Sequence, residues 1–162
     1  DNPRLTCRIN GLENRSPARI ILDRKLEIPL NSKVIKESKT FETIIFYNKE
    51  NKKKINLLKQ LKIKTYKISL NKYKKINLKE TLLKAKKLGF TRIFLECGIT
   101  LGKSFFNEKL INNFNLFISK NNVSQIGRMN VKSFLRKVLK YKKKNIINVN
   151  LFGDKLILYK FK

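Results

Sequence analysis

Residues 43–96 read TIIFYNKENKKKINLLKQLKIKTYKISLNKYKKINLKETLLKAKKLGFTRIFLE and decide the fold class of the chain. Three short runs of apolar, β-branched and aromatic residues, at 43–47, 65–70 and 92–96, predict strands. Each gap between them holds a longer segment with the signals of a helix. Strands that alternate with helices are typical of an α/β domain with a parallel sheet, whose two faces are covered by helices.

The two helices between these strands have separate sequence signals. In residues 52–61 the apolar residues recur every three positions, with lysines on the other side. Asn77 is suited to a helix N-cap, because its side-chain oxygen can accept a hydrogen bond from the first turn, and Glu80 follows three residues later. Gly89 then ends the second helix. We therefore expect one helix at 52–61 and another between Asn77 and Gly89.

The alternation continues on both sides of this stretch. We expect a buried strand at 18–22, a helical turn at 31–38, a helix at 100–107, a strand at 114–119 and a helix at 131–139. The last two strands, 146–152 and 155–161, surround Gly153-Asp154 and predict a hairpin. The fold class is therefore α/β, a mostly parallel sheet flanked by helices with a C-terminal antiparallel hairpin. The 162 residues suit a single domain.

The charge of the chain is strongly positive. Lys and Arg number 39 against 11 Asp and Glu, which gives a net charge of +28. Such a balance favours a nucleic-acid-binding module, because Lys and Arg neutralise phosphates. Only 8 of the 39 are Arg, however, and Arg is the side chain suited to bidentate phosphate and base contacts. A solvated lysine-rich surface explains the same numbers, and we expect no specific nucleic-acid partner.

Several classes of site are excluded by composition. The chain has no His, so it has no His-based triad, zinc ligand or general base. Cys7 and Cys97 are too far apart for a CxxC site and are expected to be structural thiols, so we expect no metal. No apolar run approaches the length of a membrane span and no signal-peptide pattern opens the chain, which favours a cytosolic location without a membrane partner.

Residues 92–104, RIFLECGITLGKS, have the layout of a phosphate site. The expected strand ends at Glu96, Gly98 allows a close approach of the backbone, and a helix begins near Thr100. The free N–H groups of a helix N-terminus favour an anion. Two other interpretations stay open, because a strand-to-helix turn needs a glycine anyway and Glu96 can pair with one of the many lysines.

The first eight residues, DNPRLTCR, hold Arg4 and Arg8 in a turn-rich segment. Two of only eight arginines beside a proline suggest phosphate capture, although exposed loop arginines explain them equally well. This segment is similar to D-[DN]-P-x-L-T-x-R of the riboflavin-pathway deaminase/reductase family, in its C-terminal reductase domain. RSPARIILDR at 15–24 resembles the next strand of that family, and TRIFLECGITLGKSFF at 91–106 resembles its E-x-G-x-T-L turn. LINNFNLFIS at 110–119 also fits the family pattern.

The resemblance implies a dihydrofolate-reductase-like fold and an NADPH-dependent oxidoreductase. The family reduces 5-amino-6-(5-phosphoribosylamino)uracil, a phosphorylated pyrimidine, to its ribitylamino form, and a homodimer is expected. By the matched positions, Leu5, Arg8 and Glu96 would contact the substrate, with Arg8 near its phosphate; the residues that catalyse proton transfer stay unassigned. The expected NADPH-binding residues are Asp1, Arg24, Gly98, Ile99, Thr100, Leu101, Gly102, Lys103 and Ser104.

The sequence also departs from the family pattern. Cys97 stands where the family has Gly or Ala, Asn112 and Asn113 replace an acidic pair, and residues 120–130 replace a proline-containing loop. The first strand of the family precedes the DNP segment, so we expect a parent protein with that strand and an upstream zinc deaminase domain. Two alternatives remain: a non-specific nucleic-acid-binding domain, and a reductase-like domain without activity.

Overall fold

The structure is a computed structural model of the 162-residue chain, and it describes residues 2–120, 131–141, 143–147 and 152–161. The chain forms two compact units, Asp1–Thr91 and Arg92–Lys162, and each is described by itself. Among the described residues, no helix is both long and apolar enough to span a membrane.

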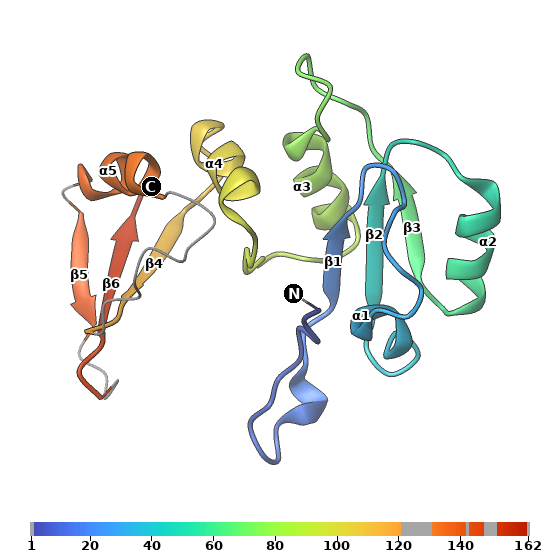
Figure 1. The fold of residues 1–162 in the computed structure, drawn as a ribbon, viewed down its shortest axis with the longest axis horizontal. Helices are drawn as coiled ribbons and strands as arrows, with labels where there is room; N and C mark the ends of the chain where they lie inside the picture. The colour runs from blue at the N-terminus through green and yellow to red at the C-terminus, as the bar shows by residue number, and fades with distance from the viewer. Residues whose placement is uncertain (1, 121–130, 142, 148–151, 162) are drawn as a thin grey trace. The chain divides into compact units, whose positions relative to one another are not determined.

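The N-terminal unit is built on a parallel sheet in the order β1-β2-β3 (Figure 1). The strands are β1 (Arg19–Leu22), β2 (Thr43–Tyr47) and β3 (Lys64–Lys67). The central strand is fully buried, whereas β3 at the side of the sheet has exposed ends. A continuous apolar run is what a strand buried on both faces requires, and this is the reason that TIIFY occupies the centre.

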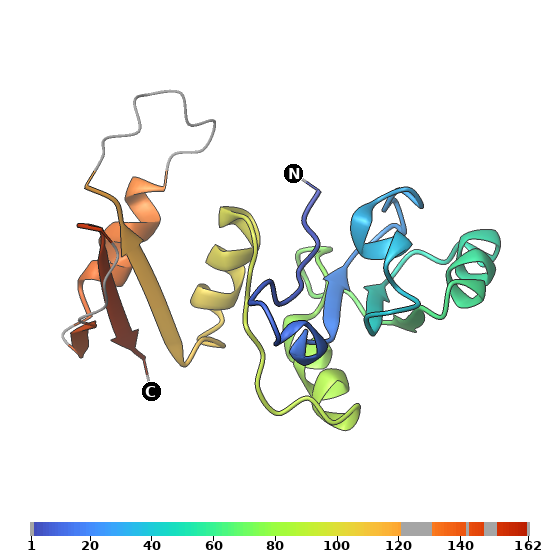
Figure 2. The ribbon, with the colours of Figure 1, turned by 90° about the horizontal axis from the view of Figure 1, so that it is seen from below.

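Helices cover both faces of this sheet (Figures 1 and 2). On one face Ile45 and Tyr47 pack with the apolar residues of α1 (Lys33–Lys36) and α2 (Lys52–Gln60). On the other face Ile44 and Phe46 pack with Ala85 of α3 (Leu78–Lys87). Successive side chains of a strand point to opposite faces, so β2 contributes to both cores. A short 3₁₀ helix, Glu13–Arg15, precedes β1.

Both long helices of this unit begin at an asparagine cap. Asn51 Oδ1 accepts a hydrogen bond from Lys54 N at 3.0 Å, and Asn77 Oδ1 accepts one from Glu80 N at 3.2 Å. The cap predicted at Asn77 is therefore confirmed. The Glu80 carboxylate binds the Ser69 amide at 3.1 Å and also accepts from the Ser69 hydroxyl. Glu80 thereby ties the start of α3 to the segment that follows β3.

The C-terminal unit contains an antiparallel sheet in the order β4-β6-β5. Its elements are α4 (Ile99–Asn107), β4 (Asn113–Ile118), α5 (Lys132–Leu139), β5 (Lys144–Ile147) and β6 (Lys155–Lys160). Phe134 and Val138 of α5 pack on Tyr159, which is 1% exposed. Phe106 of α4 lies edge-on to Phe134, with ring centroids 5.4 Å apart. Aromatic packing thus joins both helices to one face of the sheet.

The expected α/β class, with a parallel sheet and a C-terminal antiparallel hairpin, is confirmed. The hairpin strands β5 and β6 pair antiparallel, and Phe152 (φ 52°) and Gly153 (φ 98°) supply the positive φ angles of the turn before β6. Residues 148–151, which include part of the expected first hairpin strand, lie outside the described residues. The expected strand at 114–119 forms as β4, paired antiparallel with β6.

The expected strand at 92–96 is wrong. These residues have no regular secondary structure, and Ile93 and Phe94 are 44% and 81% exposed. A strand is maintained by hydrogen bonds to a neighbour, and within the described parts of the chain no strand pairs with this segment. An apolar run indicates the propensity for a strand, but it does not supply that neighbour. Cys97, for which a structural thiol is expected, is an exposed residue whose thiol is partly removed from solvent.

Candidate functional site

Three loops leave the sheet of the N-terminal unit at the carboxyl ends of its strands. Arg24 follows β1, Asn48 and Lys49 follow β2, and the loop at 68–76 follows β3. In Figure 1 β1 and β2 point to the top of the view, and the loop between β3 and α3 projects on that same side. Ligands of open α/β sheets gather at this edge, because the strands end together and their loops expose polar groups there.

Arg24 links these loops. Its carbonyl oxygen accepts hydrogen bonds from Asn48 N at 3.0 Å and Lys49 N at 2.8 Å. Its guanidinium Nη1 donates to the carbonyl oxygen of Lys74 at 2.8 Å. Asn48 Nδ2 donates to the carbonyl oxygen of Ile68 at 2.9 Å. The carboxyl ends of the three strands therefore form one hydrogen-bonded edge.

Asp23 shapes the loop that carries Arg24. Its carboxylate accepts hydrogen bonds from Glu27 N at 3.0 Å and Ile28 N at 2.8 Å, and Leu26, which directly precedes these two residues, has a positive φ of 58°. Both carboxylate oxygens are thus occupied by backbone amides. Asp23 organises the turn, and the exposed Arg24 side chain beside it is one cation of this edge that could bind an anion.

The charge at this edge is positive. Lys49, Lys72, Lys74 and Lys75 are exposed, and in the described part of the chain none of them forms an ion pair. With Arg24 they place five cationic side chains on the three loops. Cations grouped on an ordered backbone create a local potential that attracts phosphates.

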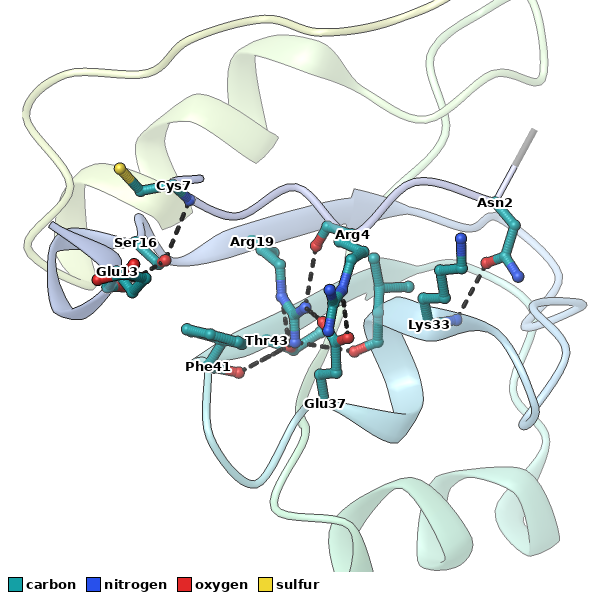
Figure 3. Close-up of polar contacts among 11 residues, drawn as sticks. Asn2, Arg4, Cys7, Glu13, Ser16, Arg19, Lys33, Glu37, Phe41 and Thr43 are labelled. Carbon is teal, nitrogen blue, oxygen red and sulfur yellow. Dashed lines mark hydrogen bonds and ion pairs between the residues drawn. The ribbon is translucent and has the colours of Figure 1, made fainter. Parts of the chain in front are cut away.

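Residues 2–8 are held to the opposite, amino-terminal part of β1 and β2 by a buried arginine (Figure 3). Arg19 is 2% exposed, and its Nη1 donates to the carbonyl oxygen of Arg4 at 3.0 Å. Its other donors bind Thr43 Oγ1 and the carbonyl oxygens of Val34 and Phe41 at 2.7–3.2 Å. Glu37 Oε2 lies 3.6 Å from Arg19 Nη1. Burial lowers the pKa of Arg19, and Glu37 partly offsets this effect.

The contacts of this network fix part of the DNPRLTCR segment, and its two arginines differ in their surroundings. Arg4 Nε forms an ion pair with Glu37 Oε1 at 2.6 Å, so Arg4 has a structural partner within the unit. Arg8 is exposed. Leu5 has a φ of 57° and packs against the core cluster that includes Leu26, two residues after Arg24. The segment is thus an ordered part of the unit, anchored at Arg4 and Leu5.

The other group of expected site residues lies in the C-terminal unit. Gly98 is the N-cap of α4, and the first hydrogen bond along the helix runs from Gly102 N to Gly98 O at 3.1 Å. The amides of Ile99, Thr100 and Leu101 precede it and have no partner within the helix. Ser104 Oγ donates to the carbonyl oxygen of Thr100 at 3.1 Å. Glu96 is exposed just before the helix.

The structure therefore divides the expected site residues between its two units. Leu5, Arg8 and Arg24 belong to the N-terminal unit, whereas Glu96 and residues 98–104 belong to the C-terminal unit. Asp1 lies outside the described residues. No group of three or more His, Cys, Asp or Glu among the residues that the structure describes could hold a metal ion.

Several residues of this architecture are not predicted as site residues from the sequence. Arg19 belongs to the apolar strand expected at 18–22, and a charged residue within such a run is itself a signal of a buried network. Asn48 and Lys49 directly follow the strongest predicted strand, and their position was the available signal. The loop residues at 71–75 carry no motif that would single them out in the sequence.

Comparison with known proteins agrees with this architecture. The family described as the RibD C-terminal domain matches residues 1–120. The riboflavin biosynthesis protein RibD of Aquifex aeolicus is 32% identical over 98% of this chain and 42% of its own length. RibD of Chlamydia trachomatis is 29% identical over 69% of this chain and 30% of its length. The chain thus spans less than half the length of these relatives.

Solved structures show the same fold. RibD of Acinetobacter baumannii has a TM-score of 0.67 and 19% sequence identity, and the match covers 100% of this chain and 44% of that one. A pyrimidine reductase-like protein from Corynebacterium diphtheriae has a TM-score of 0.58 and 12% identity, covering 90% of this chain and 61% of its own. With the family match over most of its residues, this chain belongs to the RibD C-terminal domain family.

Proposed function

We propose that this protein reduces 5-amino-6-(5-phosphoribosylamino)uracil to the ribitylamino product of riboflavin biosynthesis, with NADPH as the electron donor. The observation that carries the proposal is the cationic edge around Arg24, in a chain that belongs to the RibD C-terminal domain family. Two anionic compounds take part in this reaction, and an edge rich in Arg and Lys complements both.

The reaction depends mainly on how the two reactants are positioned. NADPH supplies a hydride to the electrophilic ribosyl carbon, and a proton completes the reduction of the ribosyl group. Binding both reactants side by side accounts for much of the rate enhancement in such a reaction, so the lack of His is no obstacle. The chain has to bind two phosphorylated molecules and orient them.

The residues divide into two roles under this proposal. Arg24 and the helix N-terminus at residues 98–104 would hold the cofactor, the first through its guanidinium and the second through the free amides of α4. Leu5, Arg8 and Glu96 would contact the substrate, with Arg8 near its phosphate. The resemblance also implies a homodimer, which light scattering on the purified protein tests.

Titration calorimetry with NADPH tests the proposal on the 162-residue chain and on the full-length product of its gene. Arg24→Gln removes the guanidinium charge and is expected to weaken NADPH binding about tenfold or more, since one charge-assisted hydrogen bond contributes about 1.5–3 kcal/mol. Arg15→Gln is the matched control, because Arg15 is an exposed arginine of the 3₁₀ helix. If the full-length product showed no saturable NADPH binding, the proposal would be wrong.

The substrate roles need a separate measurement. Arg8→Ala and Glu96→Gln are expected to raise the KM for the ribosylamino substrate more than the Kd for NADPH. An equal rise of the KM and the Kd would show that these two residues have been given the wrong roles. Turnover of the substrate by the full-length product distinguishes an active reductase from a reductase-like domain without activity.

A further inference from the structure

The loop between β3 and α3 is closed at its base and fixed at its tip. Leu70 and Ile76 form an antiparallel bridge, and Asn77 N donates to the carbonyl oxygen of Ser69 at 3.0 Å. At the tip, Asn71 Oδ1 accepts hydrogen bonds from Tyr73 N at 3.0 Å and Lys75 N at 3.1 Å. A loop with this many internal bonds has lost most of its freedom before any ligand arrives, which lowers the entropy cost of binding.

This fixed loop presents an aromatic ring to solvent. Tyr73 is 70% exposed, and Lys72 Nζ lies 5.2 Å from its ring centroid. Lys74 and Lys75 follow it directly. Tyr66 of β3 also has a lysine over its ring, Lys84 Nζ at 4.4 Å, but it is half-buried, so Tyr73 is the ring of the two that solvent reaches more fully. An exposed ring with cations beside it suits a flat, electron-rich ring that carries phosphates.

The loop is also joined to the cationic edge described above. The Arg24 guanidinium donates to the carbonyl oxygen of Lys74, the residue next to Tyr73. A cation proposed for the cofactor and an exposed aromatic ring are therefore held by one hydrogen-bonded network. In Figure 1 this green loop projects beyond the strand ends of the N-terminal unit.

We propose that Tyr73 is the surface on which the adenine ring of the cofactor stacks, with the lysines of the same loop close to its phosphates. This inference rests on the proposed function, since it assigns the adenine half of NADPH to the loop at 70–76. The ring supplies dispersion and π-stacking, and Lys72, Lys74 and Lys75 supply charge. Tyr73 is then a binding residue that discriminates adenine-containing cofactors from the bare nicotinamide nucleotide.

Three probes separate the two halves of the cofactor: NADPH, 2′,5′-ADP and reduced nicotinamide mononucleotide. Tyr73→Ala is expected to weaken the binding of NADPH and of 2′,5′-ADP by the same factor, about tenfold. Base stacking on an aromatic side chain raises affinity by about this factor or more. Binding of the mononucleotide should not change. Tyr73→Phe should bind as the unaltered protein does, since it keeps the ring. Leu83→Ala is the control, because Leu83 is 61% exposed on α3 outside these loops.

A spectroscopic readout is available because the chain contains no tryptophan. In Tyr73→Trp the only indole stands at the proposed stacking position, and its emission should be quenched by 2′,5′-ADP along a saturable curve. A merely structural role of Tyr73 would produce no such quenching. Circular dichroism of each variant verifies that the fold is retained.

The results decide the inference separately from the proposed function. If the unaltered protein binds NADPH and Tyr73→Ala binds it equally well, the inference is overturned and the proposed function stands. If NADPH fails to bind while 2′,5′-ADP binds through Tyr73, the stacking of adenine on Tyr73 is supported and the proposed function fails. If neither compound binds, both fail. Tyr73-dependent binding of a single-stranded oligonucleotide at physiological salt, without binding of 2′,5′-ADP, would also overturn the assignment to a cofactor.

Discussion

Replacing Arg19 by Met is expected to destabilise the protein strongly. Arg19 lies at the start of β1 with its side chain 1% exposed, and it donates to Thr43 Oγ1 and to three backbone carbonyl oxygens. Methionine replaces the unbranched aliphatic part of arginine, so the substitution keeps the packing of that part and removes the guanidinium with its donors and its charge. One of these donors also binds the carbonyl oxygen of Arg4 and so helps to hold the N-terminal segment.

The magnitude follows from what is left behind. Without the guanidinium, the carbonyl oxygen of Val34 loses its donor and Glu37 Oε2, which has no hydrogen bond in the described structure, loses the cation 3.6 Å away. Glu37 Oε1 keeps its ion pair with Arg4. Removing one member of a buried charged pair costs about 3–5 kcal/mol. The free energy of unfolding of a domain is about 5–15 kcal/mol, so this loss removes a large part of the stability. The expected fall in Tm is about 10 °C.

Urea unfolding followed by circular dichroism measures the effect, with Arg15→Met as the matched control. Arg15 is exposed, and its replacement should change the free energy of unfolding by no more than about 0.5 kcal/mol. Thr43→Val completes a double-mutant cycle, because Thr43 Oγ1 accepts from both Nε and Nη2 of Arg19, and a coupling of about 1–2 kcal/mol is expected. A loss below about 1 kcal/mol for Arg19→Met would refute the reasoning.

Three further predictions test other parts of the molecule. Asn77→Ala should cost about 1 kcal/mol in urea unfolding, because it removes the cap of α3, and an unchanged midpoint would contradict the cap. Val138→Ala should cost about 2–3 kcal/mol, since this residue is fully buried against Tyr159 in the C-terminal unit; a loss under 1 kcal/mol would show that the core relaxes around the gap. Burial raises the pKa of the Cys97 thiol, partly offset by a hydrogen bond from the Gly102 amide. In a Cys7→Ser background, the alkylation rate of Cys97 should therefore rise at higher pH in the folded chain than in urea, and the opposite order would contradict the burial.

Sequence patterns predicted most elements because their causes are local. TIIFY became the central strand at the expected residues, and the asparagine cap of α3 formed as the sequence indicated. The segment at 92–96 has the same kind of apolar run but no strand forms there, since strand formation also depends on a neighbour far away in the sequence. Local propensity predicts which residues can form a strand, whereas tertiary context decides which of them do.

The site was predicted less completely than the fold, for a related reason. Resemblance to a family singles out residues that recur in a motif, such as Arg24. The contacts that hold Arg24 come from Asn48, Lys49 and Lys74, which lie up to fifty residues away and follow no motif of their own. Hydrogen bonds to backbone atoms leave almost no trace in the sequence, because any residue can supply a carbonyl oxygen. Only the folded chain reveals them.

The net charge of +28 does not identify a function, because the lysines serve different purposes in different places. Lys64 pairs with Glu42 at 2.6 Å and Lys67 approaches Glu50 at 3.8 Å, both on the side strand β3, where charged side chains discourage pairing with another chain. Lys84 covers the ring of Tyr66. The lysines beside Tyr73 differ from these in one respect: they stand on a fixed loop that is hydrogen-bonded to Arg24. Because the chain is strongly basic, charge by itself favours no single surface, and the loop at 70–76 is favoured as a candidate site by its hydrogen bond to Arg24 together with its exposed aromatic ring.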